Sequence, residues 1–325
     1  MKNLLLGILA TLTLVSSPVA KAQVITTKLT GTKTVYAHTV WPITKSSTAD
    51  GAKLSSAFGP RLKASSNFRY DFHSGIDIPK AEGTPVYAIA SGTVYNVYSA
   101  TDKTSPYYGA GGNVVVVKHT LANPITFHGK QLTTFYSHYL HLKNYSVTKG
   151  QLVTKGKAIG QVGHTGTTEL NHLHFEIRLG TACSREYQTA NPTTLCAQTF
   201  GSTPQDPHIN PLLFLGYTEA GSITATVTQK NPLKIKIASN RAELDFNEIK
   251  VSYQNQTKII NFNDRTGLDL NNLDNNNYNG VLISPAKFNS STAQYEIEFQ
   301  LAGWTDFSSV EARDIWGNGV KLTQN

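Results

Sequence analysis

Apolar and polar residues alternate most regularly in the sequence NHLHFEIR at positions 171–178. This period of two predicts a β-strand whose apolar side chains share one face. His172 and His174 then lie side by side on the opposite face. Two imidazoles in that arrangement suit a metal ion, or one metal ligand beside one proton-transfer group. A pair of solvated surface histidines fits this segment equally well.

Short apolar runs separated by turn residues recur along the chain, and long helical periodicity is missing. Gly83 and Gly92 punctuate runs at 85–90 and 93–97, as expected of consecutive antiparallel strands. The sequence NVVVVKH at 113–119 predicts a buried central strand. The fold class is therefore predicted to be mainly β.

The alternation resumes after residue 217 in runs at 233–237, 295–301 and 310–316, which Asn, Gly and Asp turns separate. Such spacing is typical of a small sandwich of two sheets. We therefore expect a β-rich accessory domain at 217–325, whose role is not legible from the sequence.

The first 22 residues have the composition of a secretory signal peptide, with Lys2, an apolar run at 4–15 and Ala20-Lys21-Ala22 before Gln23. The run is shorter than the roughly 20 residues of a spanning helix, so stable membrane insertion is not expected. Residues 23–50 are polar and are interpreted as a leader segment. The protein is predicted to be exported, to a periplasm or to the extracellular space.

The chain has 29 basic and 21 acidic residues among its 325, a formal charge of +8. Removal of Lys2 and Lys21 with the signal peptide leaves +6, which favours an anionic partner such as a cell-wall polymer. Nucleic acid is not expected as a partner because Lys and Arg do not cluster and charged residues are only 15% of the chain. The oligomeric state is not predictable from these features.

The two cysteines, Cys183 and Cys196, flank a polar loop. In an exported protein they predict a disulfide. Thiolate metal ligands would need further Cys or His residues at zinc spacing, and none accompanies them.

A second element with metal-ligand chemistry precedes the paired histidines. His73 and Asp77 form an HxxxD sequence, with Gly75 and Pro79 favouring a loop that leads into a strand. Catalytic zinc sites use three nitrogen or oxygen ligands and keep a fourth position for water. His73, Asp77 and one of the strand histidines would complete such a set.

The HxxxD and HxH elements, with GTPVYA at 83–88 and SGTV at 91–94, resemble the zinc endopeptidases of the LytM and lysostaphin type, peptidase family M23. The resemblance covers roughly residues 41–215. It implies an antiparallel-sheet LytM-like catalytic domain at 51–215. It also implies that His73, Asp77 and His174 bind Zn²⁺, and that His141 and His172 are catalytic.

The YxH element of that family has two candidates here, His138 and His141. The downstream glycine and valine run, from Val147 to Gly160, has the expected offset from His141. His138 has the opposite strand parity and is expected to face away from the site. Which of His141 and His172 acts as the base stays open.

The resemblance implies a zinc-dependent endopeptidase that hydrolyses the peptide cross-links of bacterial peptidoglycan. The alternative is a non-catalytic regulator that activates other cell-wall hydrolases, since some relatives have lost zinc ligands. All five positions are filled here, which favours catalysis. The cross-link that is cut is not predictable.

Overall fold

The computed structural model describes residues 24–31, 39–45, 54–63, 69–127, 130–183, 207–215, 223–239, 246–262, 277–278, 281–284, 287–292, 294–314 and 317–324. Within these ranges it consists of strands and turns, with a single short 3-10 helix, η2 (Pro211–Leu213). The prediction of a mainly β protein is confirmed. None of the helical structure described has the length and apolar character needed to cross a membrane. The predicted signal peptide and Cys196 lie outside the described residues.

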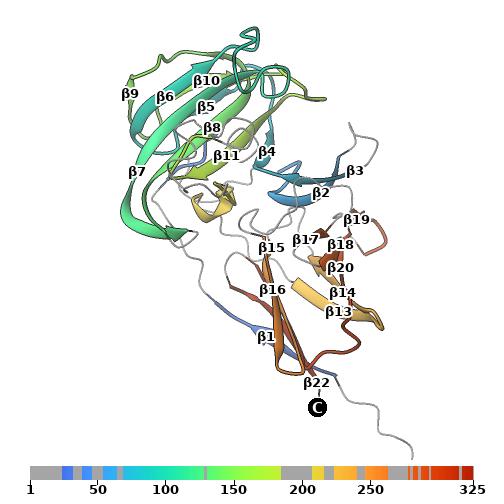
Figure 1. Ribbon diagram of the computed structural model, residues 1–325. Helices are drawn as coiled ribbons and strands as arrows, with labels where there is room; N and C mark the ends of the chain where they lie inside the picture. Colours follow the sequence, from blue (N-terminus) through green and yellow to red (C-terminus); the bar gives the residue numbers. More distant parts are fainter. Residues whose placement is uncertain are drawn as a thin grey trace, which may run out of the picture.

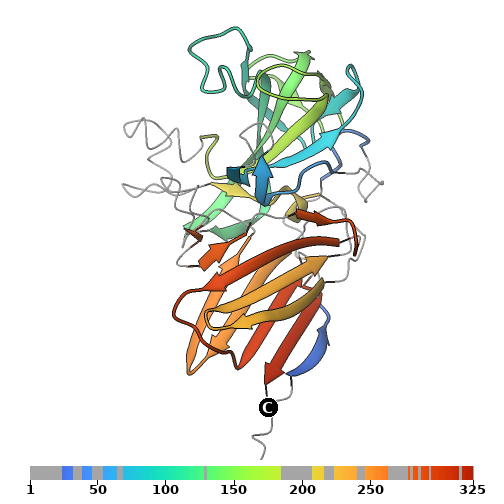
Figure 2. The same ribbon diagram turned by 90° about the vertical axis from the view of Figure 1, so that its right-hand side faces the viewer.

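The largest sheet among the described residues has nine strands, in the order β12-β11-β8-β7-β6-β9, with β4 paired to β11 and β10 paired to both β5 and β8. Figures 1 and 2 show it forming the upper part of the molecule. Its strands are β4 (Ile76–Pro79), β5 (Pro85–Tyr87), β6 (Gly92–Tyr98), β7 (Asn113–Phe127), β8 (Lys130–Tyr145), β9 (Leu152–Val153), β10 (Ala158–Val162), β11 (His172–Leu179) and β12 (His208–Ile209).

The predicted central strand is confirmed, because β7 lies between β6 and β8. The two runs after Gly83 do not pair with each other, however. β5 pairs with β10, whereas β6 pairs with β7 and β9. The chain between them leaves the ladder at Ile89, whose amide donates to the Tyr139 hydroxyl at 3.0 Å. At Ile89 the hydroxyl of the buried Tyr139 thus takes the place of the neighbouring strand that the sequence pattern suggests as hydrogen-bond partner.

Two further sheets lie in the lower part of Figures 1 and 2. One has the order β1-β22-β21-β15-β16, and the other has β13-β14-β20-β18-β17 with β19 on β20. Their strands are β1 (Val24–Leu29), β13 (Ile223–Lys230), β14 (Leu233–Ser239), β15 (Phe246–Tyr253), β16 (Gln256–Asn261), β17 (Asn277–Tyr278), β18 (Val281–Ile283), β19 (Lys287–Asn289), β20 (Gln294–Leu301), β21 (Ser309–Asp314) and β22 (Gly319–Gln324).

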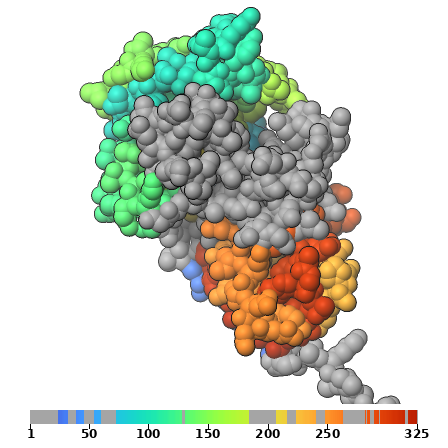
Figure 3. Space-filling model, in the orientation of Figure 1, coloured from blue at the N-terminus to red at the C-terminus, as the bar shows by residue number. Residues whose placement is uncertain are grey.

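These two sheets are held together by apolar side chains that face each other. Ile235 and Phe299 of one sheet and Ile249 and Val310 of the other are almost fully buried in the same core cluster. This arrangement matches the predicted sandwich. The space-filling view places these strands at the opposite end of the molecule from the nine-stranded sheet (Figure 3).

The segment interpreted as a leader contributes to the sandwich. β1 pairs antiparallel with β22 along its whole length, from Val24 opposite Gln324 to Leu29 opposite Gly319. The division of the chain into domains at 51–215 and 217–325 stays a prediction, with the qualification that residues 24–29 lie in the C-terminal sheet.

A two-stranded hairpin of β2 (Gly59–Lys63) and β3 (Arg69–His73) precedes the nine-stranded sheet. Its last residue is His73, so the hairpin delivers this histidine to the start of β4. In β11, Leu173, Phe175 and Ile177 are fully buried against the main core. His174, Glu176 and Arg178 on the other face are also buried, which marks that face as a packed polar site instead of open surface.

Candidate metal centre

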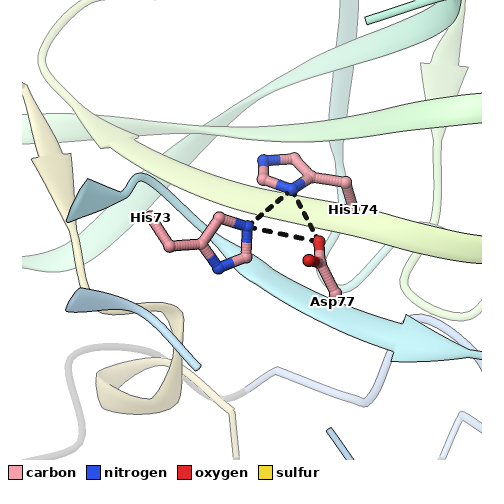
Figure 4. Close-up of side chains that lie close together, drawn as sticks. All are labelled: His73, Asp77 and His174. Carbon is pink, nitrogen blue, oxygen red and sulfur yellow. Dashed lines mark hydrogen bonds and ion pairs between the residues drawn. The ribbon is translucent and has the colours of Figure 1, made fainter. Parts of the chain in front are cut away.

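The backbone pairing of β4 with β11 places Asp77 directly opposite His174. Ile76 and Ile78 enter the core, so the period of two turns Asp77 toward the polar face. His73 reaches the same point from the end of β3. Figure 4 shows the three side chains pointing toward one another. The sequence therefore brings together one carboxylate and two imidazoles from three strands.

One atom of each side chain converges on a common point. His73 Nε2 lies 3.0 Å from His174 Nδ1 and 3.2 Å from Asp77 Oδ1. His174 Nδ1 lies 2.8 Å from the same oxygen. Potential ligand atoms of all three residues lie within 4.8 Å of one another. Two imidazole nitrogens with one carboxylate oxygen form the donor set of three-ligand catalytic metal sites.

The second ring nitrogens explain why this set suits a cation. His73 Nδ1 lies 2.9 Å from the Ala57 carbonyl oxygen, which can only accept, so Nδ1 carries the proton. Its Nε2 therefore presents a lone pair to His174 and Asp77. His174 Nε2 lies 3.1 Å from a Glu176 oxygen and can donate there, which directs a second lone pair from Nδ1 to the same point. Converging lone pairs repel unless a proton or a metal ion lies between them, so the residues fit a metal.

Charges around the cluster favour the same arrangement. Burial alone would raise the pKa of the Asp77 carboxyl, but the charge of His73 and hydrogen bonds from His172 and His174 outweigh it and hold that pKa well below its usual range. Burial would lower the pKa of His174, yet its bonds to Asp77 and Glu176 raise it to about 9. A proton at His174 therefore competes with a cation for this position.

His141 and His172, the two predicted catalytic residues, lie beside the cluster. Their ring centroids are 4.9 Å apart, and His141 is 5.9 Å from the His174 ring. Each Nδ1 lies 2.8 Å from a backbone carbonyl, that of Thr165 for His141 and that of Leu170 for His172. Each Nδ1 must therefore donate, and each neutral ring keeps Nε2 for proton exchange.

The expectation that His138 faces away from the side of His141 is wrong. β8 contains an irregularity between residues 139 and 142, where the register with β7 shifts and His141 has a φ of 59°. Tyr139 and Leu142 enter the main core on one face, so both residues between them lie on the other. His138 shares that face because it is the direct partner of Glu176. Counting residues along the strand assumes strict alternation of side chains and therefore cannot reveal a bulge of this kind.

His138 nevertheless differs from His141 in its surroundings. It is fully buried, and its Nδ1 lies 2.6 Å from the hydroxyl of Tyr107. Burial, reinforced by the charge of Arg178, lowers its pKa. Tyr107 therefore packs against this histidine, whereas Tyr108 beside it is exposed.

The sequence did not identify Glu176 as part of the site. Its carboxylate accepts hydrogen bonds from Ser74 at 2.9 Å and from Arg178 at 2.9 and 2.6 Å, besides its contact with His174. The signal available in the sequence was its place two residues after His174, on the same face of the strand. Its remaining partners come together only in the fold.

Comparison with known proteins shows which family this region of the chain is similar to. Residues 71–188 match the model of peptidase family M23. Peptidoglycan DD-endopeptidase ShyA of Vibrio cholerae is 34% identical over 125 residues, which are 38% of this chain and 24% of that protein. DD-carboxypeptidase/endopeptidase Mpg of Neisseria meningitidis is 33% identical over 141 residues, 43% of this chain and 28% of that protein. The match thus spans about a quarter of the length of these relatives.

Among solved structures, a zinc containing peptidase from Vibrio cholerae is similar at 28% identity and a TM-score of 0.33, covering 45% of this chain and 37% of that one. The catalytic domain of lysostaphin from Staphylococcus simulans is also 28% identical, with a TM-score of 0.31, covering 41% of this chain and 85% of that one. The family-model match contains His73, Asp77, His141, His172 and His174. The region of this chain that is similar to peptidase family M23 is therefore the region that holds all five candidate site residues.

Proposed function

We propose that the protein is a zinc-dependent endopeptidase that hydrolyses peptide cross-links of bacterial peptidoglycan. The observation that carries this proposal is the convergence of His73 Nε2, Asp77 Oδ1 and His174 Nδ1 beside two further imidazoles. The family match and the names of the relatives supply the reaction class.

His73, Asp77 and His174 would hold the Zn²⁺ ion, because they provide the two-nitrogen, one-oxygen set typical of catalytic zinc. When bound, zinc polarises a carbonyl oxygen and lowers the pKa of a water molecule toward neutrality. The protein contributes buried surroundings for this chemistry. All three ligand residues are at least nine-tenths buried, so their charges act in a medium of low polarity.

His141 is assigned as the general base. Burial and the neighbouring His174 lower its pKa to about 3, so its ring is neutral at physiological pH. Its Nδ1 donates to the Thr165 carbonyl, which leaves the lone pair of Nε2 as the proton acceptor. The Thr165 carbonyl, which accepts from Nδ1, steadies the imidazolium that this transfer creates.

His172 is assigned to stabilise the developing oxyanion through Nε2. Its Nδ1 donates to the Leu170 carbonyl, which leaves Nε2, 3.5 Å from Asp77 Oδ1, as the nitrogen that faces the metal cluster. An N–H group at that position can donate a hydrogen bond to negative charge on the substrate.

Exposed apolar side chains near the site suit an extended peptide. Tyr108 is 49% exposed and Leu170 is 75% exposed. Both belong to loops that bond directly to the candidate catalytic histidines, since Gly111 accepts from the His141 amide and Leu170 accepts from His172. We assign these two side chains to substrate contact. The formal charge of +6 without the signal peptide suits an anionic wall polymer.

Digestion of purified sacculi by the mature protein tests the proposal. Fragment masses should reveal cleaved peptide cross-links, and a chelator should abolish their release until zinc is restored. Release of fragments with cut glycan strands and intact peptides would contradict the endopeptidase assignment. No release, combined with activation of a second hydrolase on mixing, would support the regulator instead.

The same preparation tests export and the proposed Cys183–Cys196 disulfide. The mature chain should begin at Gln23 and have a periplasmic or extracellular location. Its intact mass should rise on alkylation only after reduction. Two thiols that are alkylated without reductant would contradict the disulfide.

A further inference from the structure

The ring of His174 is held from both sides. Its Nδ1 lies 2.8 Å from Asp77 Oδ1, and its Nε2 lies 3.1 Å from Glu176 Oε1. Asp77 and His174 belong to the metal site of the proposed function, whereas Glu176 contacts only the far edge of the ring. The contact at Nε2 therefore needs an explanation of its own.

Glu176 is itself fixed by several donors. Ser74 Oγ donates to Oε1 at 2.9 Å, while Arg178 donates to Oε2 from Nε at 2.9 Å and from Nη2 at 2.6 Å. His208 Nε2 lies 3.3 Å from Oε2. Only 4% of Glu176 is exposed. A carboxylate with this many partners cannot rotate away from His174.

Gly75 brings the chain against the same contact. A Cβ atom at Gly75 would lie 2.9 Å from His174 Nε2, 3.0 Å from Glu176 Cγ and 2.4 Å from the Phe175 carbonyl oxygen. No side chain fits there. The loop that leads from β3 to β4 therefore closes over the histidine and the carboxylate and shields their hydrogen bond from solvent.

We propose that Glu176 is a positioning residue that fixes the tautomer of His174, keeping the proton on Nε2 and the lone pair of Nδ1 directed at the metal. This inference rests on the metal site of the proposed function. A carboxylate on the far nitrogen of a metal-binding histidine sets the ring orientation and increases its basicity. Arg178 and Ser74 act through Glu176, because each donates hydrogen bonds to its carboxylate.

The arrangement predicts an unusual effect of Glu176→Gln, which barely changes size. Arg178 donates twice to Oε2, so the glutamine oxygen takes that position and the NH₂ group faces His174. That NH₂ group donates to Nε2, which moves the ring proton to Nδ1. A protonated Nδ1 cannot bind a metal ion. The variant should fold while it binds zinc weakly.

Zinc affinity of the full chain, measured by competition with a chromogenic chelator, tests this. We expect Glu176→Gln to bind zinc about 10- to 100-fold more weakly than the wild type. Glu296→Gln is the matched control, because Glu296 is a buried carboxylate that accepts from Lys236 and Asn289 in the C-terminal sheet. It should bind zinc as the wild type does. Thermal unfolding of the metal-free proteins verifies that both variants fold.

Equal zinc affinity of wild type and folded Glu176→Gln would overturn the positioning role and leave the proposed function intact. A wild type that binds no zinc would overturn the metal site itself. A measurement without mutation covers the case of a variant that does not fold. In the zinc-loaded wild type, ¹⁵N NMR should show the His174 proton on Nε2, and a proton on Nδ1 would refute the inference.

Discussion

His141 reaches the site because of a single irregular residue in β8. Its φ of 59° is in the left-handed region, which costs roughly 1–2 kcal/mol for a residue with a side chain. Two hydrogen bonds hold it there, from its amide to the Gly111 carbonyl at 2.9 Å and from Nδ1 to the Thr165 carbonyl at 2.8 Å. Backbone strain of this kind is tolerated where the surrounding contacts fix the conformation, and such strained residues are frequent in functional sites.

The first prediction concerns the catalytic assignment of His141. His141→Ala should keep bound zinc, because this residue is outside the three-ligand set, and should lose about 10²-fold or more in turnover. Fragment release from sacculi and metal analysis measure the two effects separately. His164→Ala, in an exposed loop, is the control and should stay active. An inactive, zinc-loaded His138→Ala beside an active His141→Ala would reverse the assignment.

The second prediction concerns the ligand set. His174→Ala should lose the zinc ion because Nδ1 is the nitrogen closest to Asp77. Metal analysis after dialysis measures this, with His172→Ala as the control that should retain zinc. Stoichiometric zinc in His174→Ala would refute the ligand set.

At the residue scale, the sequence predicts which side chains share a face of a regular strand, but it does not predict bulges or contacts between distant segments. The period of two places His172 and His174 on one face of their strand, but the family resemblance selects His174 as the ligand. The pairing of β4 with β11, which puts Asp77 opposite His174, comes only from the fold. The face on which His138 lies is mispredicted, because the bulge in β8 interrupts the alternation of side chains and the amino-acid sequence does not reveal it. The contacts of Glu176 involve His208, more than thirty residues away along the chain.

At the level of elements, a buried polar chain connects the bend after β5 to the central strands. The Ile89 amide donates to the Tyr139 hydroxyl, which lies 3.0 Å from Ser137 Oγ, which in turn lies 2.7 Å from His119 Nε2. His119 Nδ1 donates to the Ser91 carbonyl at 3.0 Å. These bonds fix the bend that separates β5 from β6. They also explain why adjacent apolar runs do not form a hairpin.

The third prediction is a pH effect on this chain. Burial lowers the pKa of His119 to about 4 from an ordinary value of 6.5. The unfolded chain therefore takes up a proton at His119 before the folded one does. The stabilisation is complete above pH 6.5 and is lost as the pH falls toward 4. We expect a loss of about 3 kcal/mol from this residue between about pH 8 and about pH 4.

Urea unfolding of the wild type and of His119→Gln at both pH values isolates this contribution. Glutamine does not titrate, so the free energy of unfolding should fall less steeply with pH in the variant. Parallel pH dependences of the two proteins would show that His119 is not the residue responsible.

On the scale of the whole molecule, residues near the two ends of the described chain share one sheet. β1 precedes residues 71–188, which match the M23 family model, and pairs with β22, which follows them. The sequence pattern misses β1 because its side chains are exposed except for the half-buried Leu29. Periodicity detects strands through the face that they bury, whereas main-chain hydrogen bonds hold this one. The C-terminal sandwich therefore includes residues that precede residues 71–188 and residues that follow them.

The last prediction is that β1 protects β22 through its backbone alone. Deletion of residues 24–29 should remove hydrogen-exchange protection from those amides of Gly319–Gln324 that face β1, because the deletion leaves the edge of β22 unpaired. Protection in β11 and zinc affinity should not change, because neither depends on this ladder.

A variant with the six residues 24–29 in scrambled order is the matched control. It keeps the backbone and should keep the protection, since five of these six side chains are exposed. Unchanged exchange in β22 after the deletion would contradict the pairing, whereas loss of protection in the scrambled variant would show that side-chain packing holds the strand.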